Sequence, residues 1–71
     1  MDRNEAVRLA TAFAEHQGRD VARYGTDAVK TDDEWTVRFR PMDEARPRPG
    51  DFFTVHVDDR TGSIVRMVHG K

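Results

Sequence analysis

Basic side chains are the most promising polar feature of this sequence. Arg38 and Arg40 alternate along a segment that predicts a β-strand, so both lie on the same side of it. Arg46 and Arg48 follow in a proline-rich loop, and His56 stands in a second predicted strand. Because a guanidinium group pairs with a carboxylate through two parallel hydrogen bonds, we expect these residues to bind an acidic protein partner.

Two other interpretations of the same residues stay open. The Arg side chains, with Arg66, can form a solvated face whose charges offset the many Asp and Glu residues, and codon usage in a GC-rich genome would also favour Arg over Lys. Alternatively, the bases of single-stranded RNA could stack on Phe52, beside the row of Arg38, Arg40 and Arg66. A net charge of −1, however, lacks the positive excess that nucleic-acid binding needs, and we expect no nucleic-acid partner.

Residues for covalent catalysis or metal binding are sparse. The chain has no Cys, and its only Ser, Ser63, falls in a predicted turn without the pattern of a nucleophile elbow. His16, His56 and His69 lack the paired spacing of metal ligands. His56 and Asp58 share one side of a strand, which provides two ligands at most. The sequence therefore predicts a protein that is not an enzyme and uses no metal or cofactor.

The chain length of 71 residues lies near the lower limit for a domain that folds without a disulfide or a metal. Hydrophobic residues make up 37% and charged residues 35%, which allows one small core beneath a charged surface. Such a core stabilises the fold by about 3–5 kcal/mol. A bound partner or a homodimer is therefore expected to add to the stability of so small a domain.

The location expected for this protein is the cytoplasm. Its apolar runs fall far short of the ~20 residues that span a membrane, so we expect no membrane partner. The segment Met1–Glu5 is charged, and the apolar stretch that a signal peptide requires does not follow it. The lack of Cys fits a reducing compartment. This expectation holds unless the chain is a fragment of something larger.

Residues 2–17 are expected to form an amphipathic helix. Asp2 and Glu5 match an N-terminal capping pattern, and Gly18 stands where a left-handed C-terminal cap belongs. The small alanines of its apolar face would let the helix lie close on a sheet. The residues that helical spacing brings to this face are Ala6, Leu9, Ala10, Phe13, Ala14 and Gln17.

The segment 35–40 is expected to be a half-buried antiparallel strand. Pro41 ends it, because Pro cannot donate a hydrogen bond to a neighbouring strand. The loop 41–50 holds three Pro residues and exceeds the usual hairpin length, and loops of this kind are often functional. Alternation along the strand places on one side its apolar residues Trp35, Val37 and Phe39.

The stretch between the helix and this strand has two interpretations. Residues 19–26 either complete a further helical turn or lead across to the sheet, and Gly25 breaks the run. Residues 27–31 are expected to form a short edge strand that turns Ala28 or Val29 inward.

Residues 52–57 and 64–69 are expected to form a β-hairpin. Both runs are rich in β-branched or aromatic residues, and the joint between them is rich in Asp and contains Gly62. The second run is apolar on both sides, so either row of side chains can face the helix. We expect Val65 and Met67 to point inward.

These elements combine into a single α+β domain over residues 1–71. Its simplest form is one N-terminal helix packed on a three- or four-stranded antiparallel sheet. Leu9 and Phe13 would then share an interior with Trp35, Val37, Phe39, Phe53, Val55 and Val57. The opposite face of such a sheet stays wet and would carry Thr36, Arg38, Arg40, Thr54 and His56.

Several short motifs follow one another along the chain: an Ala-rich helix, Tyr24-Gly25, Trp35-Thr36-Val37, the run 51–58, Thr61-Gly62-Ser63-Ile64-Val65 and His69-Gly70-Lys71. In this order they resemble the small bacterial immunity proteins of the nuclear-transport-factor-two-like group. The resemblance covers most of the chain and implies a protein that neutralises a cognate toxin by direct binding, with no catalytic residues. Pro49-Gly50 stands where such proteins often have two glycines. A packing role is implied for Trp35, Val37, Phe53, Val55 and Val57.

The hairpin that closes on Asp58, Thr61 and Gly62 is also similar to that of PepSY-type domains, where a helix precedes a strand and a hairpin ending in Asp-x-x-Thr-Gly. This second resemblance implies a cystatin/PepSY-like fold. It also implies a role in inhibiting or regulating a peptidase, or in sensing at an envelope.

Overall fold

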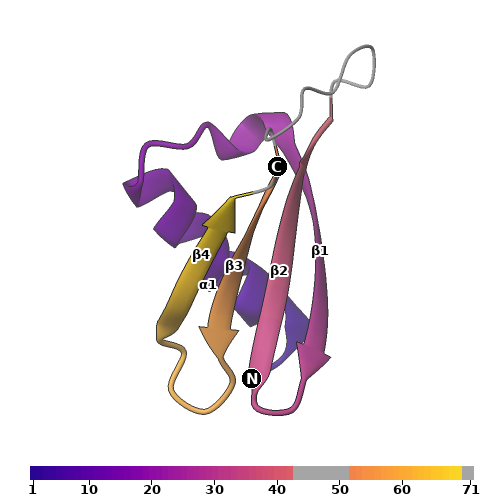
Figure 1. The fold of residues 1–71 in the computed structure, drawn as a ribbon, viewed down its shortest axis with the longest axis vertical. Coiled ribbons are helices and arrows are strands. Elements are labelled where there is room, and N and C mark those ends of the chain that lie inside the picture. The colour runs from indigo at the N-terminus through magenta and orange to yellow at the C-terminus, as the bar shows by residue number, and fades with distance from the viewer. Residues whose placement is uncertain (43–51, 70–71) are drawn as a thin grey trace.

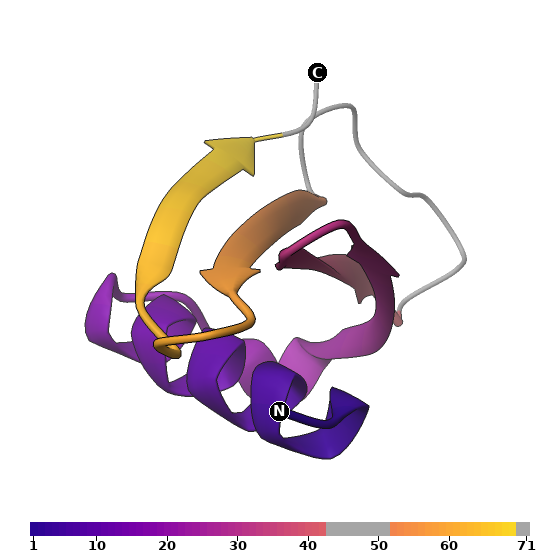
Figure 2. The ribbon, with the colours of Figure 1, turned by 90° about the horizontal axis from the view of Figure 1, so that it is seen from below.

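One helix and one sheet make up the fold. The computed structural model describes residues 1–42 and 52–69. Within them the four strands form one antiparallel sheet in the order β1-β2-β3-β4, and α1 crosses one face while the other face is left open (Figures 1 and 2). The α+β arrangement expected from the sequence is confirmed. The elements are α1 (Arg3–His16), the 3-10 helix η1 (Val21–Arg23), β1 (Tyr24–Thr31), β2 (Glu34–Pro41), β3 (Phe53–Asp58) and β4 (Ile64–His69).

Both ends of α1 are capped as the sequence predicts. The side chain of Asp2 accepts a 2.8 Å hydrogen bond from the backbone N–H of Glu5, which satisfies one of the free donors at the helix start. At the other end Gly18 has a φ of +89°. The N–H of Gly18 bonds the carbonyl of Glu15, and the N–H of Arg19 bonds the carbonyl of Ala14. This pair of bonds is the Schellman motif, which favours glycine at its left-handed position.

The link between α1 and the sheet is a single turn of 3-10 helix, after which β1 begins at Tyr24. β1 pairs with β2 over its whole length, from Tyr24 opposite Pro41 to Thr31 opposite Glu34. The edge strand expected at 27–31 is therefore present and starts three residues earlier, since pairing with β2 outweighs the low strand propensity of Gly25.

The core lies between α1 and the inner face of the sheet. Three alanines on α1 are fully buried, because their small side chains let the helix backbone approach the strands. Leu9, Phe13 and Trp35 pack against this core but stay partly exposed at its margin. Phe39 and Phe53 stack with ring centroids 4.6 Å apart. The buried core consists of Ala6, Ala10, Ala14, Val37, Phe39, Phe53, Val55 and Val57.

Strand β4 departs from regular alternation, and the expectation that Val65 points inward is wrong. Val57 lies opposite Ile64, while the preceding His56 lies opposite Arg66, so Val65 is an extra residue in a β-bulge. The bulge shifts the alternation by one residue. Ile64 and Met67 both pack against the core, whereas Val65 is 46% exposed. The inward position of Met67 is confirmed.

Candidate functional site

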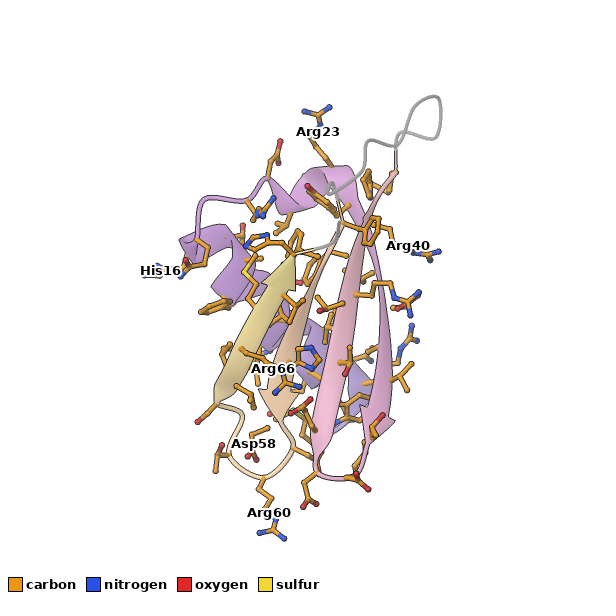
Figure 3. The ribbon with its side chains drawn as sticks, in the orientation of Figure 1. His16, Arg23, Arg40, Asp58, Arg60 and Arg66 are labelled. Atoms are coloured by element: carbon orange, nitrogen blue, oxygen red, sulfur yellow. The ribbon has the colours of Figure 1, made fainter. Side chains whose placement is uncertain are left out.

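The face of the sheet opposite α1, here called the open face, carries most of the polar residues that the sequence singled out. Residues paired across neighbouring strands point to the same side of a sheet, and the observed pairs join Asp27 to Arg38, Thr36 to His56 and His56 to Arg66. Figure 3 shows Arg66 over the middle of this face, and Arg40 projecting outward from the upper part of β2. The open face consists of Gly25, Asp27, Val29, Thr31, Glu34, Thr36, Arg38, Arg40, Thr54, His56, Asp58, Arg66 and Val68.

His56 is at the centre of one polar cluster on this face. Its Nδ1 lies 2.8 Å from Oε2 of Glu34, and the same carboxylate oxygen accepts a 3.3 Å hydrogen bond from Nη2 of Arg66. Since a carboxylate only accepts, Nδ1 of His56 carries the proton. Its Nε2 lies 3.4 Å from the hydroxyl of Thr54, and Nδ1 also lies 3.3 Å from that of Thr36. The ring is therefore held from both sides.

A second cluster joins β1 and β2. Oδ1 of Asp27 lies 3.9 Å from Nε of Arg38, and Oδ2 of Asp27 lies 3.5 Å from Nη2 of Arg40. The two Arg side chains are 53% and 60% exposed. A guanidinium group has five N–H donors in a planar fork, so one shared carboxylate leaves most of these donors available. Among the residues that the structure describes, this pair is the least neutralised positive feature of the open face.

The charges of the open face are unevenly distributed over it. Its two clusters hold three guanidinium groups, those of Arg38, Arg40 and Arg66, against the two carboxylates of Asp27 and Glu34. The chain as a whole has a net charge of −1. Asp58 lies opposite Glu34 and adds a third carboxylate to this face, so its charges balance and its local positive excess is the pair Arg38 and Arg40.

The structure brings Arg38, Arg40 and His56 onto one face, as the alternation predicts. His56 supports this face more than it presents a contact, because its side chain is only 13% exposed. Arg46 and Arg48 lie outside the described residues, as does most of the loop that contains them.

The acidic members of the two clusters were missed from the sequence. Glu34 directly follows two Asp residues typical of a turn, but it is the first residue of β2. Extending the alternation of β2 back by one residue from Trp35 would have placed Glu34 on the open face, together with Thr36. Asp27 could be assigned to Arg38 only once the register of β1 on β2 was known.

A separate contact holds the turn after β3 against the sheet. The carboxylate of Asp59 accepts a 2.7 Å hydrogen bond from Nε1 of Trp35, and its other oxygen lies 3.3 Å from Nζ of Lys30. The Trp35 hydrogen bond, followed by the Lys30 ammonium, lowers the pKa of Asp59 below its ordinary value. The backbone N–H of Asp59 also donates to the carbonyl of Asp33, which connects the two turns at this end of the sheet.

Ser63 and Asp58 stabilise the turn between β3 and β4. Oδ1 of Asp58 accepts hydrogen bonds from the backbone N–H groups of Arg60 and Thr61, and the carbonyl of Ser63 accepts one from the N–H of Asp58. Over residues 1–42 and 52–69, no group of three or more His, Asp or Glu side chains is placed to hold a metal ion. In the same part of the chain, none of the helices has the length and apolar character to cross a membrane.

Comparison with known proteins returned no relative: no family model, no curated protein and no solved structure matches this chain.

Proposed function

We propose that this chain is a protein-binding domain, without enzymatic activity, that meets an acidic surface of its partner through the open face. The observation that carries the proposal is the pair Arg38 and Arg40, which are half exposed and share the single carboxylate of Asp27. Both stand on β2, which is paired on each side by another strand. A rigid backbone therefore holds the two guanidinium groups in a constant relation to each other.

The expected contribution of these charges is to rate and selectivity. Exposed ion pairs contribute about 0.2–1 kcal/mol each, whereas complementary charge accelerates encounter and excludes unsuitable partners. Burial of apolar side chains must supply much of the affinity. Val29 and Val68 on the open face, with Phe52 just before β3, are 56%, 46% and 42% exposed and provide such area.

The resemblances noted in the sequence suggest which partner to test first. Resemblance to the immunity proteins makes a bacterial toxin the first candidate, which the chain would neutralise by direct binding in the cytoplasm. Resemblance to PepSY-type domains makes a peptidase the second candidate, which the chain would inhibit or regulate. Both roles require a stable complex and no catalysis by this chain.

The test is a binding measurement with the product of the neighbouring gene. Arg38→Glu combined with Arg40→Glu should slow association at least about tenfold, because steering by complementary charge is reversed. Arg60→Glu is the matched control, since Arg60 is also exposed and paired with an Asp but projects from the end of the sheet (Figure 3). Equal binding by the double variant and the native chain would refute a role for the open face.

A further inference from the structure

The two edges of the sheet differ in how well they are protected from pairing with another strand. β1 and β4 are the outer strands, and within the described residues no strand pairs with the outer edge of either one. β1 carries Asp27 and Lys30 and contains Gly25, all of which disfavour additional pairing. Four of the six residues of β4 are apolar: Ile64, Val65, Met67 and Val68.

The polar side chains of β4 are occupied within their own chain. Arg66 reaches across the open face to the carboxylate of Glu34 at 3.3 Å. Nδ1 of His69 contacts the guanidinium of Arg19, which also lies over the ring of Phe53 at 4.7 Å. Natural edge strands are usually protected by Lys, Pro, β-bulges or inward-pointing charges. The β4 edge has no Lys, Pro or inward-pointing charge, its protection is limited to the bulge at Val65, and its Val65 and Val68 are each 46% exposed.

We propose that β4 pairs antiparallel with β4 of a second copy of this chain, which joins two four-stranded sheets into one continuous sheet. A two-fold axis perpendicular to the sheet keeps the two open faces on the same side. Residues that lie opposite each other must then have the same inward or outward orientation. Beyond the bulge, registers centred on Met67 or on Val68 meet this condition, whereas centring on Arg66 sets the inward Met67 opposite the exposed Val65.

Apolar contact favours the Met67 register, in which Met67 lies opposite its own copy, over the Val68 register, in which Met67 lies opposite the polar His69. Centring on Arg66 is disfavoured by charge as well, since it would place two guanidinium groups directly opposite each other, which destabilises a strand pair. Centring on Met67 instead places Arg66 opposite Val68 of the second copy, and the same contact recurs by symmetry. The aliphatic part of Arg66 can then cover the exposed valine while its guanidinium remains with Glu34.

Two features favour a second copy over a foreign strand as the occupant. The Met67 register is self-complementary, because the only charged residue of β4 meets an apolar one at both symmetric positions. Assembly also stops at two copies, since the protected β1 edge becomes the outer edge on both sides. The dimer would bury the β4 edge of a domain whose own core is small.

Sedimentation velocity over micromolar to millimolar concentrations tests the proposal. The native chain should show a monomer–dimer equilibrium. Val68→Lys should raise the dimer dissociation constant about tenfold or more, because it places an ammonium opposite Arg66 of the second copy at two positions. Val68→Glu should lower it, since a carboxylate would meet the same guanidinium. Val29→Lys is the matched control, because Val29 is an exposed valine of the opposite edge strand.

Oxidation of single-cysteine variants reports the register independently, because the native chain contains no Cys. Met67→Cys should form a disulfide-linked dimer across the two-fold axis, and Val29→Cys should not. The proposal is overturned if the native chain is monomeric throughout the range. It is also overturned if Val68→Lys and Val68→Glu shift the equilibrium in the same direction, or if only Val29→Cys forms a linked dimer. A monomer that binds an extended peptide along β4 would identify a foreign strand as the occupant instead.

Discussion

The indole Nε1 of Trp35 donates a 2.7 Å hydrogen bond to the carboxylate of Asp59, which joins β2 to the turn between β3 and β4. Trp35 and Asp59 are separated by 24 positions in the sequence. The same carboxylate faces the ammonium of Lys30 on β1. This side chain therefore connects two strands with the turn after β3, in addition to the backbone hydrogen bond from Asp59 to Asp33.

The contact predicts a specific loss of stability in acid. The folded protein lowers the pKa of Asp59, chiefly through the Trp35 hydrogen bond and then through Lys30, so the unfolded chain binds a proton more readily than the folded one. The stabilisation is present above the ordinary pKa of Asp, about 3.9, and is lost as the pH falls through the lower folded value. Urea unfolding should show that Asp59→Asn destabilises the protein more at pH near 7 than at pH near 3.

The control for this measurement is Asp20→Asn, because Asp20 makes no capping hydrogen bond with its side chain at the start of η1. Its effect on the free energy of unfolding should be small and similar at both pH values. A pH-independent effect of Asp59→Asn would contradict the role assigned to the Asp59 carboxylate.

Close approach of α1 to the sheet predicts that Ala10 cannot be enlarged. Ala10 is fully buried, and extra methylene groups in a well-packed core typically cost about 1–3 kcal/mol. Ala10→Leu should therefore lower the free energy of unfolding by that amount. Ala12→Leu, an identical change at an exposed position of the same helix, should change it by less than about 0.5 kcal/mol. Equal effects of the two substitutions would show that the alanine face does not set the helix–sheet distance.

Gly62 is expected to resist substitution for two reasons. Its φ is +76°, and a Cβ built there would lie 3.3 Å from Cδ1 of Leu9. A side chain in the left-handed region costs about 1–2 kcal/mol, so Gly62→Ala should lower the midpoint of thermal unfolding clearly. Gly25→Ala is the comparison, since its Cβ would meet only the flexible side chain of Met42 at 3.6 Å and a carbonyl at 4.0 Å. A larger loss from Gly25→Ala would contradict this account of the turn.

Removing the carboxylate shared by Arg38 and Arg40 should strengthen binding to an acidic partner. Asp27→Asn abolishes the only carboxylate in contact with this pair among the described residues, so association measured by stopped flow should become severalfold faster at low salt. Asp33→Asn is the control, because it removes the carboxylate near Arg60 at the end of the sheet instead. Unchanged rates for Asp27→Asn, with a partner already shown to bind, would place the contact elsewhere on the molecule.

Local patterns were sufficient to predict much of this fold. Spacing of apolar residues and the capping residues Asp2 and Gly18 predicted α1, because helix periodicity and caps depend on residues within four positions of one another. Alternation along β2 and β3 likewise predicted which side chains are buried, and so placed Arg38, Arg40 and His56 on the open face.

Contacts between segments distant in the chain settled the remaining features. The bulge that moves Val65 outward depends on how β4 pairs with β3, and the short apolar sequence of β4 is equally compatible with either face. The partners of Glu34 and Asp27 follow from strand register, which no local pattern specifies. Local chemistry therefore determined the elements and their burial, whereas long-range pairing determined which charges meet on the open face and which strands form the outer edges of the sheet.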